Sequence, residues 1–235
     1  LGRGWKRAFA DGQWLARLGD LLAEACVVTF TPEDAALFKG PPVARRRLLD
    51  MVLSQLSPGY LAALQQHARA LRRLTAAYKL SGPDAQAREA ARAYAPIVAG
   101  AGAALMTARA ARLSAASQSL AERFGSLGGE GSLKLAYDPD LKRLPDAMLQ
   151  QAAQAAMGAQ ALPPLVELYR QRLDEAFEEG RRHGACVTGA HRDDFALRLD
   201  GRDLRRFGSR GQHRLAALTL KLESAEWLRQ ALGDA

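Results

Sequence analysis

The chain has 235 residues, a formal net charge of +8 at pH 7, 48% apolar residues and 25% charged residues, which is typical of a globular protein and excludes a disordered one. No stretch reaches the roughly 18 consecutive apolar residues that cross a bilayer, and the first residues lack the apolar segment of a signal peptide. The two cysteines, Cys26 and Cys186, are too few for a disulfide framework and favour a reducing compartment. We therefore expect a cytoplasmic protein without a membrane partner.

The positive charge is concentrated in two parts of the chain. Residues 51–130 carry nine basic and four acidic side chains, and residues 181–235 carry eleven and seven. Such a field favours polyanionic partners, nucleic acids among them. Because exposed charges also serve only to solvate a surface, the charge by itself leaves the partner open.

Strands and a helix are predicted over residues 1–50. The Asp11-Gly12 dipeptide indicates a tight hairpin over 5–15, and the β-branched run 26–30 indicates a buried strand. Thr31-Pro32 has the residue types that open a helical turn. A helix is expected from Arg45 to Leu56.

Residues 57–130 have the pattern of a helical hairpin with its turn at 81–84. Apolar residues of the first helix recur at spacings of three and four, as in the seam of a coiled coil. That predicted seam consists of Leu61, Leu64, Ala68, Leu71, Thr75 and Tyr78. The second helix is alanine-rich and is expected to run to about Gly125. Its predicted seam consists of Ala87, Ala91, Tyr94, Val98, Ala101 and Leu105.

The rest of the chain mixes helices with short strands. Strands are predicted at 133–137, 194–199 and 204–207, and helices at 145–158, 163–184 and 212–232. The Asp200-Gly201 dipeptide turns the second of these strands. The predicted fold class is therefore α+β and predominantly helical, with β-containing ends on either side of a long, coiled-coil-like insert.

The turn Ser209-Arg210-Gly211-Gln212 precedes the last predicted helix and has the residue types of an anion site. Unpaired N–H groups and the positive end of the dipole lie at a helix start. Glycine allows a phosphate to approach closely, Ser209 adds a hydroxyl, and Gln212 forms hydrogen bonds without adding negative charge. An ordinary N-cap uses the same residue types, so this turn alone does not identify its ligand.

Three further motifs occur in order upstream of this turn. They are Pro32-Glu33-Asp34, the run Gly40-Pro41 to Arg45-Arg46 and Leu49-Asp50, and Thr188-Gly189-Ala190-His191-Arg192-Asp193-Asp194. Together the four motifs resemble the RecF family of bacterial recombination mediators, which is related to the structural-maintenance and Rad50-type ATPases. The resemblance runs across nearly the whole chain. It departs from the family pattern at Ala190, where proline is usual, and after Arg73, where the family has asparagine.

The resemblance implies a partial ATP-binding-cassette head, an α/β unit, that carries a helical lobe. Residues 1–50 would belong to the head, residues 51–185 to the lobe, and residues 186–235 to the head again. The family binds ATP and magnesium between two protomers, binds duplex or gapped DNA, and acts with RecR and RecO in loading recombinase at single-strand gaps. DNA, a second copy of the chain, RecR and RecO are thus the implied partners.

The resemblance also implies roles for particular residues. Ser209, Gly211 and Gln212 would contact the γ-phosphate of an ATP held by the other protomer. His191, Arg192, Asp193 and Asp194 would lie near the nucleotide or the dimer interface. The expected DNA contacts are Arg45, Arg46, Arg47, Arg69, Arg72 and Arg73.

Two family elements do not occur in this sequence. It contains no Gly-x-x-x-x-Gly-Lys-[Ser/Thr] phosphate loop and no apolar strand that ends in paired acids to hold magnesium. Together with the leucine at position 1, this suggests a piece of a longer chain. We expect such a piece neither to bind ATP tightly nor to hydrolyse it alone, and whether it forms part of an enzyme stays open.

Other readings of the same residues remain. The heptads fit a non-enzymatic helical module that binds a protein partner through its coiled coil. A Rad50-type relative is disfavoured by the short insert and the absence of zinc-hook cysteines. His191 with Asp193 and Asp194 lacks the ligand spacing of a zinc site, so no metal is expected there.

Overall fold

The computed structural model describes residues 9–10, 13–14, 27–141, 144–155 and 160–233. Its helices, in chain order, are η2 (Pro32–Ala36), α2 (Pro42–Leu56), α3 (Pro58–Tyr78), α4 (Asp84–Ala115), α5 (Ser117–Ser126), α6 (Asp146–Ala153), α7 (Pro163–Glu175), α8 (Phe177–His183), η3 (Ala190–Arg192), α9 (Leu204–Phe207) and α10 (Arg210–Leu232). Its strands are β1 (Phe9–Ala10), β2 (Gln13–Trp14), β3 (Leu133–Asp138), β4 (Asp194–Leu199) and β5 (Arg202–Asp203). The predominantly helical α+β class is confirmed.

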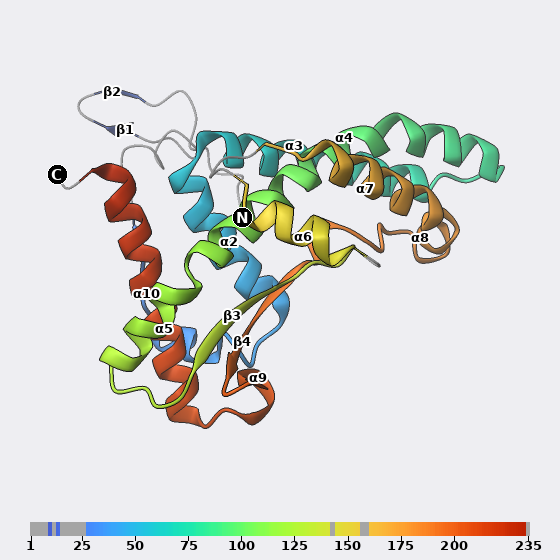
Figure 1. Ribbon diagram of the computed structural model, residues 1–235. Helices are drawn as coiled ribbons and strands as arrows, with labels where there is room; N and C mark the ends of the chain where they lie inside the picture. The colour runs from blue at the N-terminus through green and yellow to red at the C-terminus, as the bar shows by residue number, and fades with distance from the viewer. Residues whose placement is uncertain (1–8, 11–12, 15–26, 142–143, 156–159, 234–235) are drawn as a thin grey trace, which may run out of the picture.

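The helices form two arms that meet at an angle (Figure 1). The helical arm consists of α3, α4, α7 and α8, and the second arm consists of α5, α10 and the strands β3–β5. The 32-residue helix α4 runs through both, because it packs against α3 and α7 and also contacts β3. Pairing of α3 with α4 confirms the predicted helical hairpin.

The seam between α3 and α4 lies one residue away from the predicted one. The buried row on α3 consists of Tyr60, Ala63, His67, Ala70, Leu74, Ala77 and Tyr78. Apart from Tyr78, the residues predicted for this row are only half-buried. The alanine-rich face of α4 explains the shift, because small residues let two helices approach closely and leave longer side chains at the edge of the contact. On α4 the predicted seam is buried, with Tyr94 half-buried.

The second helix of the hairpin ends earlier than predicted. It stops at Ala115, and α5 starts at Ser117 in a new direction. Contacts with α10 account for the turn, because the Glu223 carboxylate accepts hydrogen bonds from Ser119 Oγ at 2.6 Å and from Arg123 Nε at 2.9 Å. These bonds hold α5 against α10 instead of in line with α4.

The antiparallel sheet has the order β3-β4-β5, with Leu133 opposite Leu199 and Asp138 opposite Asp194. The first two strands confirm the prediction. The strand predicted at 204–207 is wrong, because these residues form helix α9. Asp203 starts that helix by accepting a hydrogen bond from the Arg205 N–H at 2.8 Å.

The N-terminal part gives a mixed result. Pairing of β1 with β2 confirms the hairpin, whose turn at 11–12 is outside the described residues, as is Cys26. The strand predicted at 26–30 does not form over 27–30. The backbone there bonds to side chains instead of a neighbouring strand. The Val27 N–H donates to Gln55 Oε1 at 2.7 Å, and the Thr29 carbonyl accepts from Lys221 Nζ at 2.7 Å.

The helical predictions near this segment succeed. The turn that follows Thr31 is η2, and α2 begins at Pro42, three residues before the predicted start. Within the described ranges, no helix has the length and apolar character needed to cross a membrane.

Candidate functional site

Two sequence motifs that lie about 150 residues apart bind each other. Arg45 of α2 is 2% exposed and forms a two-pronged ion pair with Asp194, with Nε–Oδ1 at 2.7 Å and Nη2–Oδ2 at 2.8 Å. Its remaining nitrogen, Nη1, donates to the carbonyls of Leu37 and Gly40, each at 2.9 Å. The expectation that Arg45 contacts DNA is therefore corrected: the guanidinium is buried and fully engaged within the chain.

The next two arginines have different surroundings. Arg46 is half-buried and donates to the Asp193 carbonyl at 2.5 Å, and burial, followed by the nearby charge of Arg109, lowers its pKa. Arg47 is exposed. Of the three consecutive arginines, Arg47 alone has its whole side chain available to a partner.

Arg109 of α4 lies at the centre of the contacts between these two motifs, and the sequence did not indicate this role. It is 2% exposed, and its Nη1 lies 2.8 Å from Asp193 Oδ2 while its Nη2 lies 2.8 Å from Asp50 Oδ1. Arg109 also donates to the Ala190 carbonyl at 2.7 Å and to the Tyr60 hydroxyl at 3.0 Å. The available signal was a single charge inside a long run of small and apolar residues, a position where charges are rarely left unpaired.

This arrangement balances a buried charge against several partners. Burial opposes the charge of Arg109, but Tyr60, Asp50 and Asp193 raise its pKa well above the usual range. Burial raises the pKa of Asp193, and Arg109 counteracts that effect. Asp193 also accepts hydrogen bonds from the Tyr137 hydroxyl and from the Asp140 N–H. The paired acids of the motif thus anchor β4 to α2 and α4.

The two basic residues of this motif, His191 and Arg192, are more exposed than Asp193. His191 donates from Nε2 to the Cys186 carbonyl at 3.0 Å, and its ring centroid lies 6.0 Å from that of His67. Burial lowers the pKa of His191. The Arg192 side chain is half exposed and pairs with Asp140 at 3.2 Å. Arg192 is thus the residue of the motif that is most open to a ligand.

Ala190 stands where the RecF family usually has proline, and its N–H group makes a hydrogen bond that a proline could not make. Its N–H donates to the Tyr169 hydroxyl at 2.8 Å in a fully buried position. Proline has no N–H to donate. Gly189 is also fixed by this tyrosine, because a Cβ at its position would lie 1.7 Å from the hydroxyl oxygen.

The turn Ser209-Arg210-Gly211-Gln212, which we call the signature turn, lies at the exposed start of α10. Ser209 and Gln212 cap each other: Ser209 Oγ accepts from the Gln212 N–H at 3.2 Å, and Gln212 Oε1 accepts from the Ser209 N–H at 2.8 Å. The Gln212 side chain therefore folds back onto the turn. A Cβ at Gly211 would meet only Ser209 Oγ, at 3.8 Å. Nothing in the described chain requires glycine at this position.

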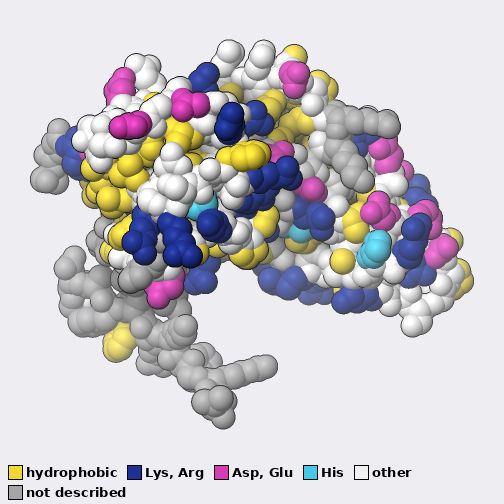
Figure 2. All heavy atoms as spheres, turned by 90° about the horizontal axis from the view of Figure 1, so that it is seen from below, with side chains coloured by type: hydrophobic (Ala, Val, Ile, Leu, Met, Phe, Trp, Pro, Cys, Tyr) yellow, Lys and Arg dark blue, Asp and Glu magenta, His cyan; other side chains and the backbone are white. Residues whose placement is uncertain are grey.

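Three of the predicted DNA contacts come together on the helical arm. Arg69, Arg72 and Arg73 are exposed on α3 and line one hollow with Tyr94 and Ile97 of α4. Seen from below, the molecule carries several groups of lysine and arginine side chains (Figure 2). Among the described residues, no group of three or more histidines, cysteines or acids is arranged to hold a metal ion.

Comparison with known proteins gives one consistent result. Proteins named "DNA replication and repair protein RecF" match the chain at 32% identity in Exiguobacterium (93% of this chain, 55% of the relative), 35% in Chloroflexus aggregans (94% and 54%) and 32% in Geobacter metallireducens (100% and 59%). No protein-family model matches the sequence.

Solved structures show the same fold. A structure described as the recombination mediator protein RecF-ATPrS in the RecFOR pathway aligns with a TM-score of 0.81 and 23% identity, covering 95% of this chain and 56% of the other. A second structure, described as RecF-ATP in that pathway, aligns with a TM-score of 0.80 and 24% identity. The chain is similar to RecF proteins over nearly its whole length, and it spans a little over half the length of the curated relatives that it matches.

Proposed function

We propose that this chain is part of a recombination mediator in DNA repair and that it contributes the signature side of an ATP-dependent dimer. The observation that carries the proposal is the exposed turn at Ser209 and Gly211, where glycine is not needed by the chain itself. A glycine that leaves open space at a helix start suits a ligand held by another molecule. The solved RecF structures described with ATP and ATPrS support a nucleotide as that ligand.

The residues present fit the phosphate end of a nucleotide. The N–H groups of Arg210 and Gly211 have no helical acceptor because they begin α10. Ser209 Oγ accepts from Gln212 and retains its own O–H for an outside acceptor. ATP bound there would supply a γ-phosphate that joins two protomers. In this proposal Ser209 and Gly211 make the direct contacts, and Gln212 supports them by capping the turn.

We further propose that the helical arm binds DNA through Arg69, Arg72 and Arg73. Their shared hollow on α3 is exposed. Residues 1–50 and 186–235 would form part of the ATPase head and residues 51–185 the lobe. RecR and RecO would act on this assembly to load recombinase at gaps, with magnesium accompanying ATP.

The test uses the chain expressed with all the coding sequence that flanks it in its gene. Ser209→Arg places a long cation in the turn, so we expect ATP-driven dimerisation to be lost in light scattering while each protomer still binds ATP. The control is Ser114→Arg, at an exposed position in the last turn of α4, and it should dimerise normally. Unchanged dimerisation of Ser209→Arg would refute the role of the signature in trans.

DNA binding is tested separately on the arm. The triple charge reversal of Arg69, Arg72 and Arg73 to glutamate should weaken binding of a gapped duplex and reduce the dependence of affinity on salt. The exposed Arg182 on α8 supplies the control, Arg182→Glu. An unchanged salt dependence in the triple variant would remove DNA contact from α3.

A further inference from the structure

Helix α3 carries two apolar rows, and the contact with α4 uses one of them. The second row contains Leu64, Ala68 and Leu71, which are half-buried. These are residues of the heptad pattern that predicted a coiled coil one position away from the observed seam. Their partners are therefore to be found on a different side of α3.

That side faces a groove between α2 and α3. Leu64, Ala68 and Leu71 line it from α3, and Val43 and Met51 line it from α2. Its volume is about 540 Å³. Val43 is 57% exposed and Met51 is 36% exposed, so both helices present apolar side chains to solvent. The helices α2 and α3 meet at an angle (Figure 1). The α2 residues that line the groove run from residue 43 to residue 54, which is about 16 Å of helix.

The charged residues that line the groove are mainly basic. Arg46 and Arg47 stand beside Val43 on α2, and Asp50 is the single acid among the lining residues. Asp50 is already engaged, because its Oδ1 accepts from the Tyr60 hydroxyl at 2.5 Å and from Arg109 at 2.8 Å. Burial, followed by the charges of His191 and Arg109, lowers the pKa of His67 to about 3, so this histidine in the groove floor is neutral. The groove thus offers an apolar floor beside a basic rim.

We propose that this groove binds an acidic amphipathic helix of a partner protein. A helix of about three turns matches the length of the α2 face. Its apolar side chains at spacings of three and four would lie on the leucine row, as in other helix-in-groove complexes. Its acidic flank would face Arg46 and Arg47 and speed the encounter. None of the residues that line the groove belongs to the signature turn at the start of α10.

The test measures binding of a labelled synthetic helical peptide by fluorescence anisotropy. The peptide carries leucines at i, i+4 and i+7 and glutamates on both flanks, and a matched peptide has lysines in place of the glutamates. Val43→Glu and Arg47→Glu should each weaken binding of the acidic peptide by about tenfold. Leu127→Glu after α5 and Arg182→Glu on α8 change comparably exposed residues elsewhere and should leave binding unchanged. The lysine peptide should not bind.

Three results would overturn the proposal. In the first, the acidic peptide fails to bind or binds the Val43→Glu variant as tightly as the parent. In the second, a single-stranded DNA oligomer displaces the peptide, and this DNA binds the Arg47→Glu variant more weakly than the parent but binds the Val43→Glu variant equally well. That result would make the groove a polyanion site. In the third, expression with the flanking coding sequence abolishes peptide binding, which assigns the groove to another segment of the same chain.

Discussion

Arg109 keeps a charge in the interior because each of its three nitrogens donates to an acceptor. Two carboxylates, one carbonyl and one phenol surround a guanidinium that is 2% exposed. A planar group with five donors suits such a site, and a lysine does not. The removal of this one side chain would leave Asp193 buried without its cation.

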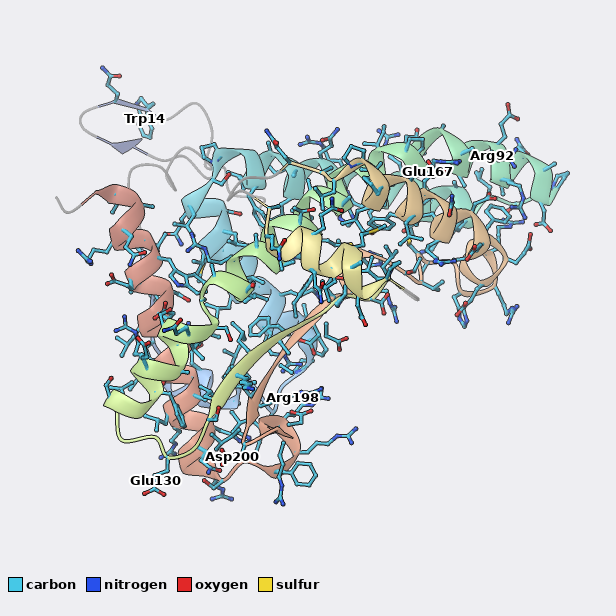
Figure 3. All side chains as sticks on the ribbon, viewed as in Figure 1. Trp14, Arg92, Glu130, Glu167, Arg198 and Asp200 are labelled. Atoms are coloured by element: carbon cyan, nitrogen blue, oxygen red, sulfur yellow. The ribbon has the colours of Figure 1, made fainter. Side chains whose placement is uncertain are left out.

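We expect Arg109→Met to lower the free energy of unfolding by about 3–5 kcal/mol, because one partner of a buried ion pair is left uncompensated. Urea unfolding followed by circular dichroism measures the change. The control is Arg92→Met on the same helix, at an exposed position toward the outer end of the arm (Figure 3), which should alter stability by less than about 0.5 kcal/mol. A decrease in the free energy of unfolding of less than about 1 kcal/mol for Arg109→Met would contradict a stabilising role for its buried ion pairs.

His67 makes stability depend on pH. Burial, together with the charges of His191 and Arg109, lowers its pKa from the ordinary 6.5 to about 3, so the unfolded chain binds a proton in this range and the folded chain does not. Stability contributed by the neutral histidine is present above pH 6.5 and is lost as the pH falls toward 3, by up to about 1.4 kcal/mol per pH unit.

His67→Gln should therefore show a shallower fall in unfolding free energy between pH 6.5 and pH 4.5, within the range set by the ordinary and lowered pKa. The measurement is urea unfolding at several pH values. The exposed His183 on α8 provides a comparison, since His183→Gln should keep the slope of the parent. Identical slopes for the parent and His67→Gln would show that this histidine is not the titrating group.

Two glycines near the signature turn have opposite surroundings: Gly208 lies between α9 and α10, and Gly211 lies in the first turn of α10. A Cβ at Gly208 would lie 2.6 Å from the Leu204 carbonyl oxygen and 2.8 Å from His213 Nε2. His213 is buried and donates to that same carbonyl at 2.7 Å. This close contact fixes α9 against α10 and sets the position of the signature turn.

Gly208→Ala should therefore destabilise the protein by about 1–3 kcal/mol, because the carbonyl cannot move away without breaking its bonds. Gly211→Ala is the matched substitution three residues later, where the space is open, and it should keep or slightly raise the melting temperature. Calorimetry of both variants measures the contrast. Equal melting temperatures would show that the α9–α10 contact is not rigid.

The elements differ in how far the sequence could predict them. Local signals were sufficient for α10, where Ser209 caps the helix, and for β3 and β4, where apolar and polar residues alternate. The seam of α3 was shifted because a leucine pattern does not reveal that an alanine-rich partner packs more tightly. The strand at 26–30 was wrong because its hydrogen-bond partners, Gln55 and Lys221, are far away in sequence. The same limit hid Arg109 and the buried role of Arg45.

At the scale of the whole molecule, ion pairs tie the first half of the chain to its last quarter. Arg45 pairs with Asp194, and Lys221 of α10 lies 3.1 Å from Asp34 of η2. The helical arm is thus inserted between two segments that bind each other. Cooperative unfolding of both segments follows, because neither keeps its buried partners without the other.

A double-mutant cycle on Arg45→Met and Asp194→Asn measures this connection. We expect a coupling free energy of about 2–3 kcal/mol, because the pair is buried and bonded at two points. The exposed pair of Arg88 and Glu178, at 2.6 Å, is the control and should couple by less than about 1 kcal/mol. Similar coupling free energies in both cycles would mean that the Arg45–Asp194 pair stabilises the protein no more than a surface ion pair does.

The distance between Arg45 and Asp194 along the chain has a consequence during synthesis. The two residues are 149 positions apart, so at 5–20 residues per second the ribosome takes roughly 7–30 s to make the second after the first. During that interval Arg45 of α2 lacks its partner Asp194, which has not yet been synthesised. The apolar face of α2 likewise remains uncovered until β4 and α10 have been made. The contact between α3 and α4 joins neighbouring segments of the chain, so it can form as soon as both helices have been made. We expect the α3–α4 hairpin to fold first on the nascent chain, and the segment around Arg45 to be the part that chaperones protect until the last quarter emerges.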